Sequence, residues 1–401
     1  MRILMVSKFK EFRGGVEAHI RDLSDGLGRG GHQVRLFASE DLPEAARAFD
    51  VGATGLAQRA HAATQLLWNG AARESVLREI DAFQPDLVHY HAIYHQLSAS
   101  VLRTQFGGPV VMTLHDYKFS APCYSLFRDD SVCELCVGKV LPVDAVKYRC
   151  VRGSAVASSL CAVEAVVNRR SYLKHVDRFV VPSRYAADIA SRGGVPEDRI
   201  AVVPWGVGSR PDHDGADRVP SADSRRFAYV GRLHGNKGIG LLLQAWEKLA
   251  PNHQAELFIA GGGEMASAVL EAAARDSSIH YMGVLTSKDV QSLLGETDCL
   301  VVPSLVPESM GLSALEGMLA GVPVLLSDRG ALGDLMGPGV VAIHQLSPEG
   351  LANDLNSLIS SADRLRDLRK HLRGRDLSPY KASVMVSGME RVYMQAESTG
   401  N

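Results

Sequence analysis

The sequence has no strong charge imbalance and no long apolar run. Across its 401 residues, 43 Lys and Arg side chains stand against 45 Asp and Glu side chains, so the formal net charge is −2. That balance provides no extended positive field for nucleic acid. A membrane-spanning helix needs about 20 mostly apolar residues, and the nearest run, residues 154–167, is interrupted by serines and Glu164. Nucleic-acid-binding and membrane-spanning proteins are therefore disfavoured.

Cysteine is scarce as well, with six residues. The apolar run at residues 3–6 is followed at once by lysines and is too short for a secretory signal peptide. We therefore expect a cytoplasmic location. In that compartment six cysteines argue against a disulfide scaffold and leave metal binding, redox chemistry or core packing. Cys161 and Cys299 fit core packing best.

A repeated strand and helix rhythm fills most of the chain. A strand at residues 2–7, a helix at about 16–27 and a strand at 32–38 give a β-α-β opening. Short apolar runs typical of buried parallel strands recur along the first half, at "DLVHYH", "PVVMTLH", "DRFVVPS" and "IAVVP". This pattern predicts an α/β fold with parallel sheets covered on both faces.

The rhythm stops once and then restarts. Residues 206–224 are rich in Pro, Gly, Asp and Ser, which predicts a linker. After it come new strand patterns at "RFAYVGRL", "AELFIAGGG", "IHYMGVL", "DCLVVPS" and "VPVLLSD". We expect two doubly wound, Rossmann-like domains, over residues 1–207 and 208–378. The amphipathic C-terminal stretch, residues 379–401, is predicted to pack back on the first domain.

One dinucleotide-binding motif is misleading. Gly26, Gly28 and Gly31 satisfy G-x-G-x-x-G, but they follow a predicted helix and precede a strand. The motif must follow a strand and open a helix, so these glycines indicate a helix end and a turn. The sequence also has no G-x-x-x-x-G-K-[ST] phosphate loop, and no D-x-D metal site stands out.

Two glutamates flank the start of a helix in the second half. Glu308 and Glu316 lie on either side of Gly311, where "CLVVPS" ends and the helix-forming run "LSALEGMLA" begins. Backbone amides around Gly311 and Leu312 should be unpaired there, which makes an anion site. The two carboxylates can then bind hydroxyl groups on both sides of a bound phosphate. A sugar nucleotide has that layout.

Positive charge for such a ligand is available in the same domain. Arg232 and Lys237 follow its first strand and can bind a diphosphate, Arg with a fork of donors and Lys as a point charge. Gly14 and Gly15, in the matching loop of the first domain, allow the backbone to approach the phosphate closely.

These motifs resemble glycosyltransferase family 4. The stretches "GGVEAH", "VGRLHGNKGIGLLLQA", "LFIAGGG" and "PESMGLSALEGMLAGVPVLLSD" occur in the order of that family, and its E-x7-E and G-R-x4-K patterns are present. The resemblance spans nearly the whole chain. It implies the GT-B fold, in which two Rossmann-like domains face each other across a cleft, and retaining transfer from a nucleotide-diphosphate sugar.

The resemblance also assigns roles to single residues. Glu308 would contact the transferred sugar, Glu316 the ribose, and Arg232 with Lys237 the diphosphate. His115 would lie beside the donor sugar near the reacting carbon. Further donor-binding positions would be Gly14, Gly15, Gly283, Val284, Ser309, Gly311 and Leu312. Two residues depart from the family pattern: Met310 stands where an aromatic is usual, and Trp205 where an Asn is usual.

The resemblance implies electrostatic catalysis that needs no cofactor, with a saccharide or lipid-linked acceptor. It suggests polysaccharide or glycoconjugate synthesis in bacteria. Two other enzymes on this fold stay open: a sugar-nucleotide epimerase, and a phosphorylase, for which no pyridoxal-binding lysine is evident. A catalytically idle sugar-nucleotide sensor is the alternative outside enzymes.

A cysteine-containing insert is expected at residues 118–153. Its C-x9-C-x2-C-x13-C spacing can form a structural zinc site or simply four buried thiols, at Cys123, Cys133, Cys136 and Cys150. His89, His91 and His95 are read as strand-end residues rather than metal ligands, and His91 or His95 can touch the acceptor.

Residues 139–178 carry an excess of positive charge, with eight basic against three acidic side chains. Next to the apolar helix expected at 154–167, this excess suggests peripheral contact with an anionic membrane. An ordinary solvated surface explains it equally well.

Overall fold

The computed structural model describes residues 1–11, 14–44, 56–104, 106–207, 225–250 and 253–399. The chain divides into two compact units, one formed by residues 1–128, 133–208 and 380–401 and the other by residues 129–132 and 209–379. The linker predicted at residues 206–224 lies almost wholly outside the described residues.

The first unit is built on a six-stranded parallel sheet with the order β2-β1-β3-β4-β7-β8. Short apolar segments form its central strands, and every residue of β3 and β4 is buried. The strands are β1 (Arg2–Ser7), β2 (Gln33–Ala38), β3 (Leu87–His91), β4 (Val110–Thr113), β7 (Arg178–Val181) and β8 (Ile200–Val202).

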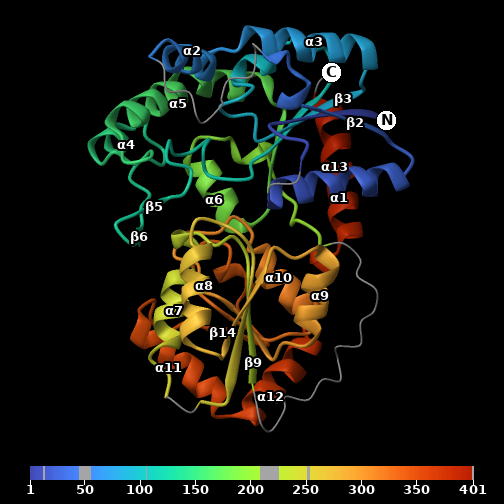
Figure 1. Ribbon diagram of the computed structural model, residues 1–401. Helices are drawn as coiled ribbons and strands as arrows, with labels where there is room; N and C mark the ends of the chain where they lie inside the picture. The colour runs from blue at the N-terminus through green and yellow to red at the C-terminus, as the bar shows by residue number, and fades with distance from the viewer. Residues whose placement is uncertain (12–13, 45–55, 105, 208–224, 251–252, 400–401) are drawn as a thin grey trace. The chain divides into compact units, whose positions relative to one another are not determined.

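Helices surround this first sheet (Figure 1). They are α1 (Gly15–Arg29), α2 (Leu56–Leu67), α3 (Gly70–Phe83), α4 (Val143–Lys147), α5 (Ala155–His175), α6 (Arg184–Arg192) and α13 (Ala382–Thr399). Two of them, α2 and α4, pack against α5. The described residues here also form the short 3-10 helices η1 (Ser39–Asp41), η3 (Ala99–Leu102) and η4 (Glu197–Arg199). The predicted insert carries strands β5 (Phe127–Arg128) and β6 (Ser131–Val132).

A glycine determines how closely α13 packs on α1. A Cβ atom added at Gly26 would come within 2.3 Å of the Val386 side chain, so only glycine permits this approach. Gly31, with φ of 86°, follows the end of α1. The glycine pattern of residues 26–31 therefore lies at a helix end before a strand, as its context predicted, and makes no dinucleotide motif.

The second unit repeats the same architecture. Its sheet is again parallel, with the order β11-β10-β9-β12-β13-β14. Its strands are β9 (Arg225–Val230), β10 (Ala255–Ala260), β11 (Ile279–Gly283), β12 (Cys299–Val302), β13 (Val324–Leu326) and β14 (Val340–Ala342). Figure 1 shows α7 and α8 on one side of this sheet and α9 and α10 on the other.

The helices of the second unit are α7 (Ile239–Trp246), α8 (Ala266–Arg275), α9 (Ser287–Gly295), α10 (Leu312–Leu319), α11 (Pro348–Ile359) and α12 (Ala362–Arg373). Short 3-10 helices among the described residues are η6 (Gly235–Lys237), η7 (Gly333–Leu335) and η8 (Ser378–Tyr380).

The strand order sets where ligands can bind. The chain runs outward from β1 to β2 and then returns to β3, and it runs from β9 to β11 and then returns to β12. In open α/β sheets, ligands bind beyond the carboxyl ends of the strands where the order reverses. The doubly wound α/β prediction is confirmed, and each unit has one such point, at β1/β3 and at β9/β12.

Candidate active site

A tight turn brings Lys237 to the β9/β12 point of the second unit. At Gly238, φ is 77° and an added Cβ would lie 1.9 Å from the Pro303 carbonyl oxygen, so only glycine fits. The amide of Leu305 also donates to the Asn236 carbonyl at 3.0 Å. The loops after β9 and β12 are therefore held together by backbone contact.

An ion pair forms where those loops meet. Lys237 Nζ donates to both carboxylate oxygens of Glu308, at 2.6 and 2.8 Å. The Ser304 hydroxyl, which is buried, donates to the same carboxylate at 2.7 Å. The lysine and glutamate side chains are 23% and 17% exposed, which leaves them accessible to a ligand. Glu308 is thus a fixed carboxylate with a cation beside it.

Arg232 provides a second cation on the same loop. Its carbonyl accepts a hydrogen bond from the Tyr229 hydroxyl at 2.9 Å, which ties the backbone to β9. Its side chain is exposed and has no ion-pair or hydrogen-bond partner within the described part of the chain. Burial raises the pKa of Tyr229, and the charge of Glu308 adds to that effect. Arg232 is therefore available to an anionic ligand.

The N-terminus of α10 lies just after Glu308. Gly311 caps the helix with φ of 81°, and an added Cβ would lie 2.5 Å from the Leu332 side chain. Within the described residues, the amides of Leu312 and Ser313 have no backbone acceptor, because they belong to the first helical turn. The expected helix end with unpaired amides is present, and anion binding there stays a prediction.

The other predicted donor-binding residues lie nearby in sequence or at neighbouring strand ends. Glu316 is one turn into α10 and half-buried, as is Ser309 in the preceding loop. Gly283 is the last residue of β11, and Val284 follows it and is 78% exposed. The Gly261 amide donates to the Gly283 carbonyl at 2.8 Å. Met310, which stands where the family pattern has an aromatic, is buried.

The first unit places four histidines together at its own β1/β3 point. His91 Nδ1 lies 3.0 Å from His115 Nε2, and the His19 ring lies 5.3 Å from the His115 ring. The rings of His89 and His91 are in contact, with their centroids 3.9 Å apart and their planes tilted by 42°. Trp205 covers this cluster, 5.0 Å from the His115 ring.

All four histidines are neutral at pH 7. Burial lowers the pKa of His19 to about 3 and the pKa values of His89, His91 and His115 well below the ordinary value. His89 is hydrogen-bonded on both ring nitrogens, to Tyr393 and Thr113. In contrast, both ring nitrogens of His19 and one each of His91 and His115 are buried without a hydrogen-bond partner in the described structure. These nitrogens have hydrogen-bonding capacity that no described residue uses.

Gly14 and Gly15 lie at the start of α1. Gly14 is the residue before the helix, and a Cβ there would meet nothing within 4 Å, so the space in front of it is open. Gly15 is the first residue of α1 and not part of a loop as the sequence suggested. A backbone approach by a phosphate is sterically free at this position.

A cavity of about 410 Å³ lies in the first unit beyond the carboxyl ends of β1 to β3. In its wall, Lys8 follows β1, Ser39 and Glu40 follow β2, and His95 follows β3. Arg152 and Leu160 also line it. Burial lowers the pKa of His95 to about 3, with further lowering by Lys118, Lys8 and Arg152. The cavity therefore combines positive charge with apolar surface.

The cysteines of the insert form no disulfide within the described residues. Cys123 and Cys136 are buried, and Cys133 and Cys150 are half-buried. Burial raises the pKa of the Cys136 thiol to about 11, and Cys123 and Cys150 add to this shift. Among the described residues, no group of three or more His, Cys, Asp or Glu is arranged to hold a metal ion. The structural zinc stays a prediction.

Sequence reasoning missed three residues of these clusters. Ser304 was read only as the end of a strand, although it lies four positions before Glu308. His19 lies in the quoted motif "GGVEAH" but was given no role. Tyr393 of α13 lies 304 positions from His89, and no local pattern predicts so distant a contact.

Two family models match the chain one after the other. The model for Glycosyltransferase Family 4 matches residues 13–209, and the model for Glycosyl transferases group 1 matches residues 216–375. A phosphatidyl-myo-inositol mannosyltransferase of Mycobacterium leprae is 26% identical over 417 aligned positions, which cover 100% of this chain and 98% of that protein.

Solved structures share the fold along the whole chain. A sucrose-phosphate synthase from Thermosynechococcus elongatus has a TM-score of 0.72 at 19% identity and covers 99% of both chains. Anabaena HepE, solved in complex with UDP-glucose, has a TM-score of 0.65 at 16% identity over 98% of this chain and 100% of its own. Together with the strand-end ion pair and the two adjoining family models, these likenesses show that the chain is a glycosyltransferase of family 4 with the GT-B fold.

Proposed function

We propose that the chain transfers a glycosyl group from a nucleotide-diphosphate sugar to a saccharide or lipid-linked acceptor, with retention of anomeric configuration. The observation that carries this proposal is the Lys237–Glu308 ion pair beside the N-terminus of α10. Cations, unpaired backbone amides and a fixed carboxylate thus lie together at the point of the sheet where α/β proteins bind ligands. The UDP-glucose complex of Anabaena HepE supports this donor class.

The diphosphate is bound by positive groups of the second unit. Arg232 and Lys237 neutralise its charge together with the amides at Leu312, so transfer proceeds without a divalent metal. Lys237 has three N–H donors, and its contacts with Glu308 leave one free for a phosphate oxygen. As the sugar leaves, negative charge grows on the diphosphate, and these groups stabilise that charge in the transition state.

The carboxylates and the histidines position the sugars. Glu308 accepts hydrogen bonds from hydroxyls of the transferred sugar, and Glu316 from those of the ribose. His115 contacts the donor sugar. The acceptor hydroxyl attacks the anomeric carbon on the face from which the diphosphate departs, and a departing phosphate oxygen takes its proton. The new glycosidic bond then has the same configuration as the old one.

The acceptor binds in the 410 Å³ cavity of the first unit. Its wall carries two basic side chains, Lys8 and Arg152, one carboxylate, Glu40, and the apolar Leu66 and Leu160. Because basic groups outnumber the acidic one, an acceptor with both anionic and apolar parts is complementary to it. We place this activity in bacterial polysaccharide or glycoconjugate synthesis, in the cytoplasm and in peripheral contact with an anionic membrane. The chain's described residues include no helix long and apolar enough to cross a membrane.

Activity measurements on single variants test the assignment. Thermal-shift screening against UDP-, GDP-, ADP- and TDP-sugars first identifies the donor. Lys237→Ala and Glu308→Ala should then each lower kcat/KM about 10²- to 10³-fold, the usual effect of losing one group that stabilises transition-state charge. Lys248→Ala removes an exposed lysine of the same unit, paired with Glu349, and should leave activity unchanged.

Other outcomes separate the alternatives. Full activity in either site variant contradicts the assignment. Turnover of the sugar nucleotide to an isomer without acceptor indicates an epimerase, and binding without transfer or hydrolysis indicates a sensor. The anomeric coupling constant of the product, measured by NMR, shows whether configuration is retained.

A further inference from the structure

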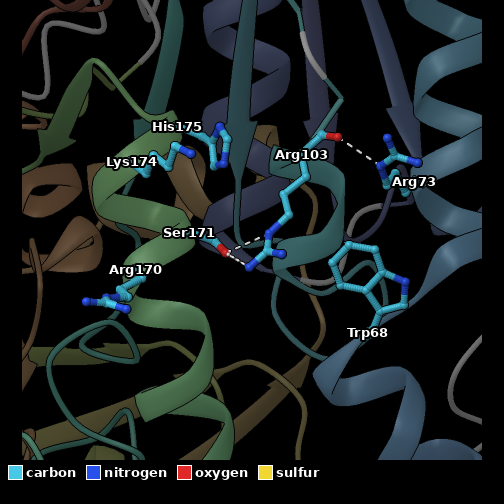
Figure 2. Close-up of a pocket in the computed structure, with 7 residues that line it drawn as sticks. All are labelled: Trp68, Arg73, Arg103, Arg170, Ser171, Lys174 and His175. Carbon is cyan, nitrogen blue, oxygen red and sulfur yellow. Dashed lines mark hydrogen bonds between the residues drawn. The ribbon is translucent and has the colours of Figure 1, made fainter.

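A second cationic cavity lies in the first unit, apart from every residue of the candidate active site. It has a volume of about 610 Å³ and is formed by the start of α3, the segment after η3 and the end of α5 (Figure 2). Basic and aromatic side chains dominate its wall, namely Trp68, Arg73, Arg103, Arg170, Lys174 and His175.

Internal contacts hold part of this wall in place. The guanidinium of Arg103 donates from two nitrogens to the Ser171 hydroxyl, at 3.1 and 2.8 Å, and lies 5.3 Å from the centre of a Trp68 ring. Arg73 donates to the carbonyl of Arg103 at 2.8 Å, as Figure 2 shows. The arginines are thus preorganised, which lowers the entropy lost when an anion binds.

No acidic side chain lines this cavity in the part of the chain that the structure describes. Within the described residues, none of its basic side chains forms an ion pair, and Arg170 and Lys174 are exposed without a partner. Burial lowers the pKa of His175, and Lys174 and Arg103 lower it further, as expected where positive charge accumulates. Arginine forks and a lysine in this arrangement are complementary to a phosphate group.

The exposed side of α5 leads into the cavity. Val156, Val163 and Val167 are exposed, and Arg170 and Lys174 continue the same line. At 3.6 residues per turn, all five positions lie within about 40° of one stripe along the helix. The helix runs to His175, eight residues beyond the end expected from the sequence, so it carries this stripe to the cavity.

The remaining charges of α5 do not oppose an anionic surface. Glu164 is the only acidic residue in the helix, and it is buried in an ion pair with Lys118, 2.8 Å away. Arg169, which the sequence analysis counted in the positive excess, donates instead to the Gly193 carbonyl and has a structural role. The stripe is therefore apolar along most of its length and cationic at its end, as in helices that lie in a membrane interface.

We propose that this cavity binds the phosphate of an anionic phospholipid headgroup while the valine stripe of α5 enters the membrane interface. A soluble phosphate compound explains the cations but gives no reason for three exposed valines beside them. The inference deepens the proposed membrane contact by naming its site, and it does not depend on the sugar donor.

Vesicle flotation of the full chain tests the cationic part. Wild-type protein should bind phosphatidylcholine vesicles containing phosphatidylglycerol more tightly than vesicles of phosphatidylcholine alone, and high salt should weaken that binding. Arg170→Glu with Lys174→Glu should lower the partition coefficient at least about thirtyfold, since each basic residue near such a surface contributes about fivefold and the two new carboxylates are repelled. The sugar-nucleotide donor should raise the melting temperature of this double variant as much as that of the wild-type protein. This measurement shows that the variant is folded.

A matched control changes net charge by the same amount elsewhere in the unit. Arg29 and Arg78 are exposed on α1 and α3 and lie outside the cavity. Arg29→Glu with Arg78→Glu should retain vesicle binding. Equal losses in the two double variants would show a general charge effect and overturn the site.

Two further arms test the lipid as the source of the phosphate. Val163→Asn with Val167→Asn keeps the charge and should weaken vesicle binding, whereas Leu270→Asn, at an exposed leucine of α8, should not. Inorganic phosphate should displace vesicles only at millimolar concentration. The proposal would be overturned if both α5 double variants bound vesicles as tightly as the wild-type protein. It would also be overturned if the protein bound inorganic phosphate tightly and bound no vesicle.

Discussion

At the scale of single residues, the site depends on how one carboxylate is held. Glu308 receives hydrogen bonds from Lys237 and from the buried Ser304, so its two oxygens have a fixed direction. The sequence indicated that Glu308 and Lys237 belong to one site because each follows a strand. It did not show that they touch, because their side chains lie 71 positions apart and meet only through the strand order.

Ser304 is expected to act through Glu308. Ser304→Ala removes a hydrogen bond to a charged group, which typically contributes 1.5–3 kcal/mol. We expect kcat/KM to fall about 10- to 100-fold in steady-state kinetics with the identified donor. Ser292→Ala, at an exposed serine of α9, serves as the control. Unchanged kinetics in a folded Ser304→Ala protein would show that Glu308 does not need this contact.

At the scale of elements, short apolar runs were a reliable guide and helix ends were less so. The strand predicted at residues 2–7 is β1, and the strand predicted at 32–38 is β2 with one residue fewer. The apolar pattern of α5 stops at Val167, yet the helix continues because Arg, Leu and Lys are good helix formers. Hydrophobic patterning alone therefore predicts too early an end for α5, because helix propensity and tertiary packing carry the helix further.

The start of α10 gives a prediction with a matched control. Gly311 and Gly321 both have positive φ, 81° and 73°, but an added Cβ meets Leu332 at Gly311 and nothing within 4 Å at Gly321. Both Gly→Ala variants should lose about 1 kcal/mol of stability or more from backbone strain. Only Gly311→Ala should also weaken donor binding, because the clash displaces the helix end that binds phosphate.

Isothermal titration with the donor checks this difference. Equal donor affinity in Gly311→Ala and Gly321→Ala would mean that the N-terminus of α10 does not bind the phosphate. Thermal melts of both variants show whether their losses of stability are comparable.

At the scale of the whole molecule, doubly wound sheets were predictable and the histidine cluster was not. Alternating strands and helices predict parallel sheets, and the reversal of strand order follows from that class of fold. His19, His89, His91 and His115 come from α1, β3 and the segment after β4. Only the three-dimensional packing of these elements brings their rings together, and Tyr393 adds a contact from the far end of the chain.

The cluster predicts how stability depends on pH. The pKa of folded His19 is about 3, below the ordinary value of 6.5. Between these values the unfolded chain binds protons that the folded chain does not, so stability is complete above about pH 6.5 and falls as pH falls. His89, His91 and His115 shift in the same direction and steepen the loss.

Denaturant unfolding between pH 7 and pH 4.5 measures this loss. His19→Gln should make the decline shallower by up to about 1.4 kcal/mol per pH unit, because one histidine no longer has to stay neutral. His61→Gln, at an exposed histidine of α2, is the control. An unchanged slope in His19→Gln would contradict the burial of a neutral His19.

The central claim is that a diphosphate lies at the start of α10 between Arg232 and Lys237. A crystal structure of the protein with the sugar nucleotide that gives the largest thermal shift tests it most directly. We predict phosphate oxygens about 3 Å from the amide of Leu312 and from Lys237 Nζ, with Glu308 on the sugar hydroxyls. A nucleotide bound elsewhere, or bound here with Lys237 and Glu308 turned away from it, would contradict the account.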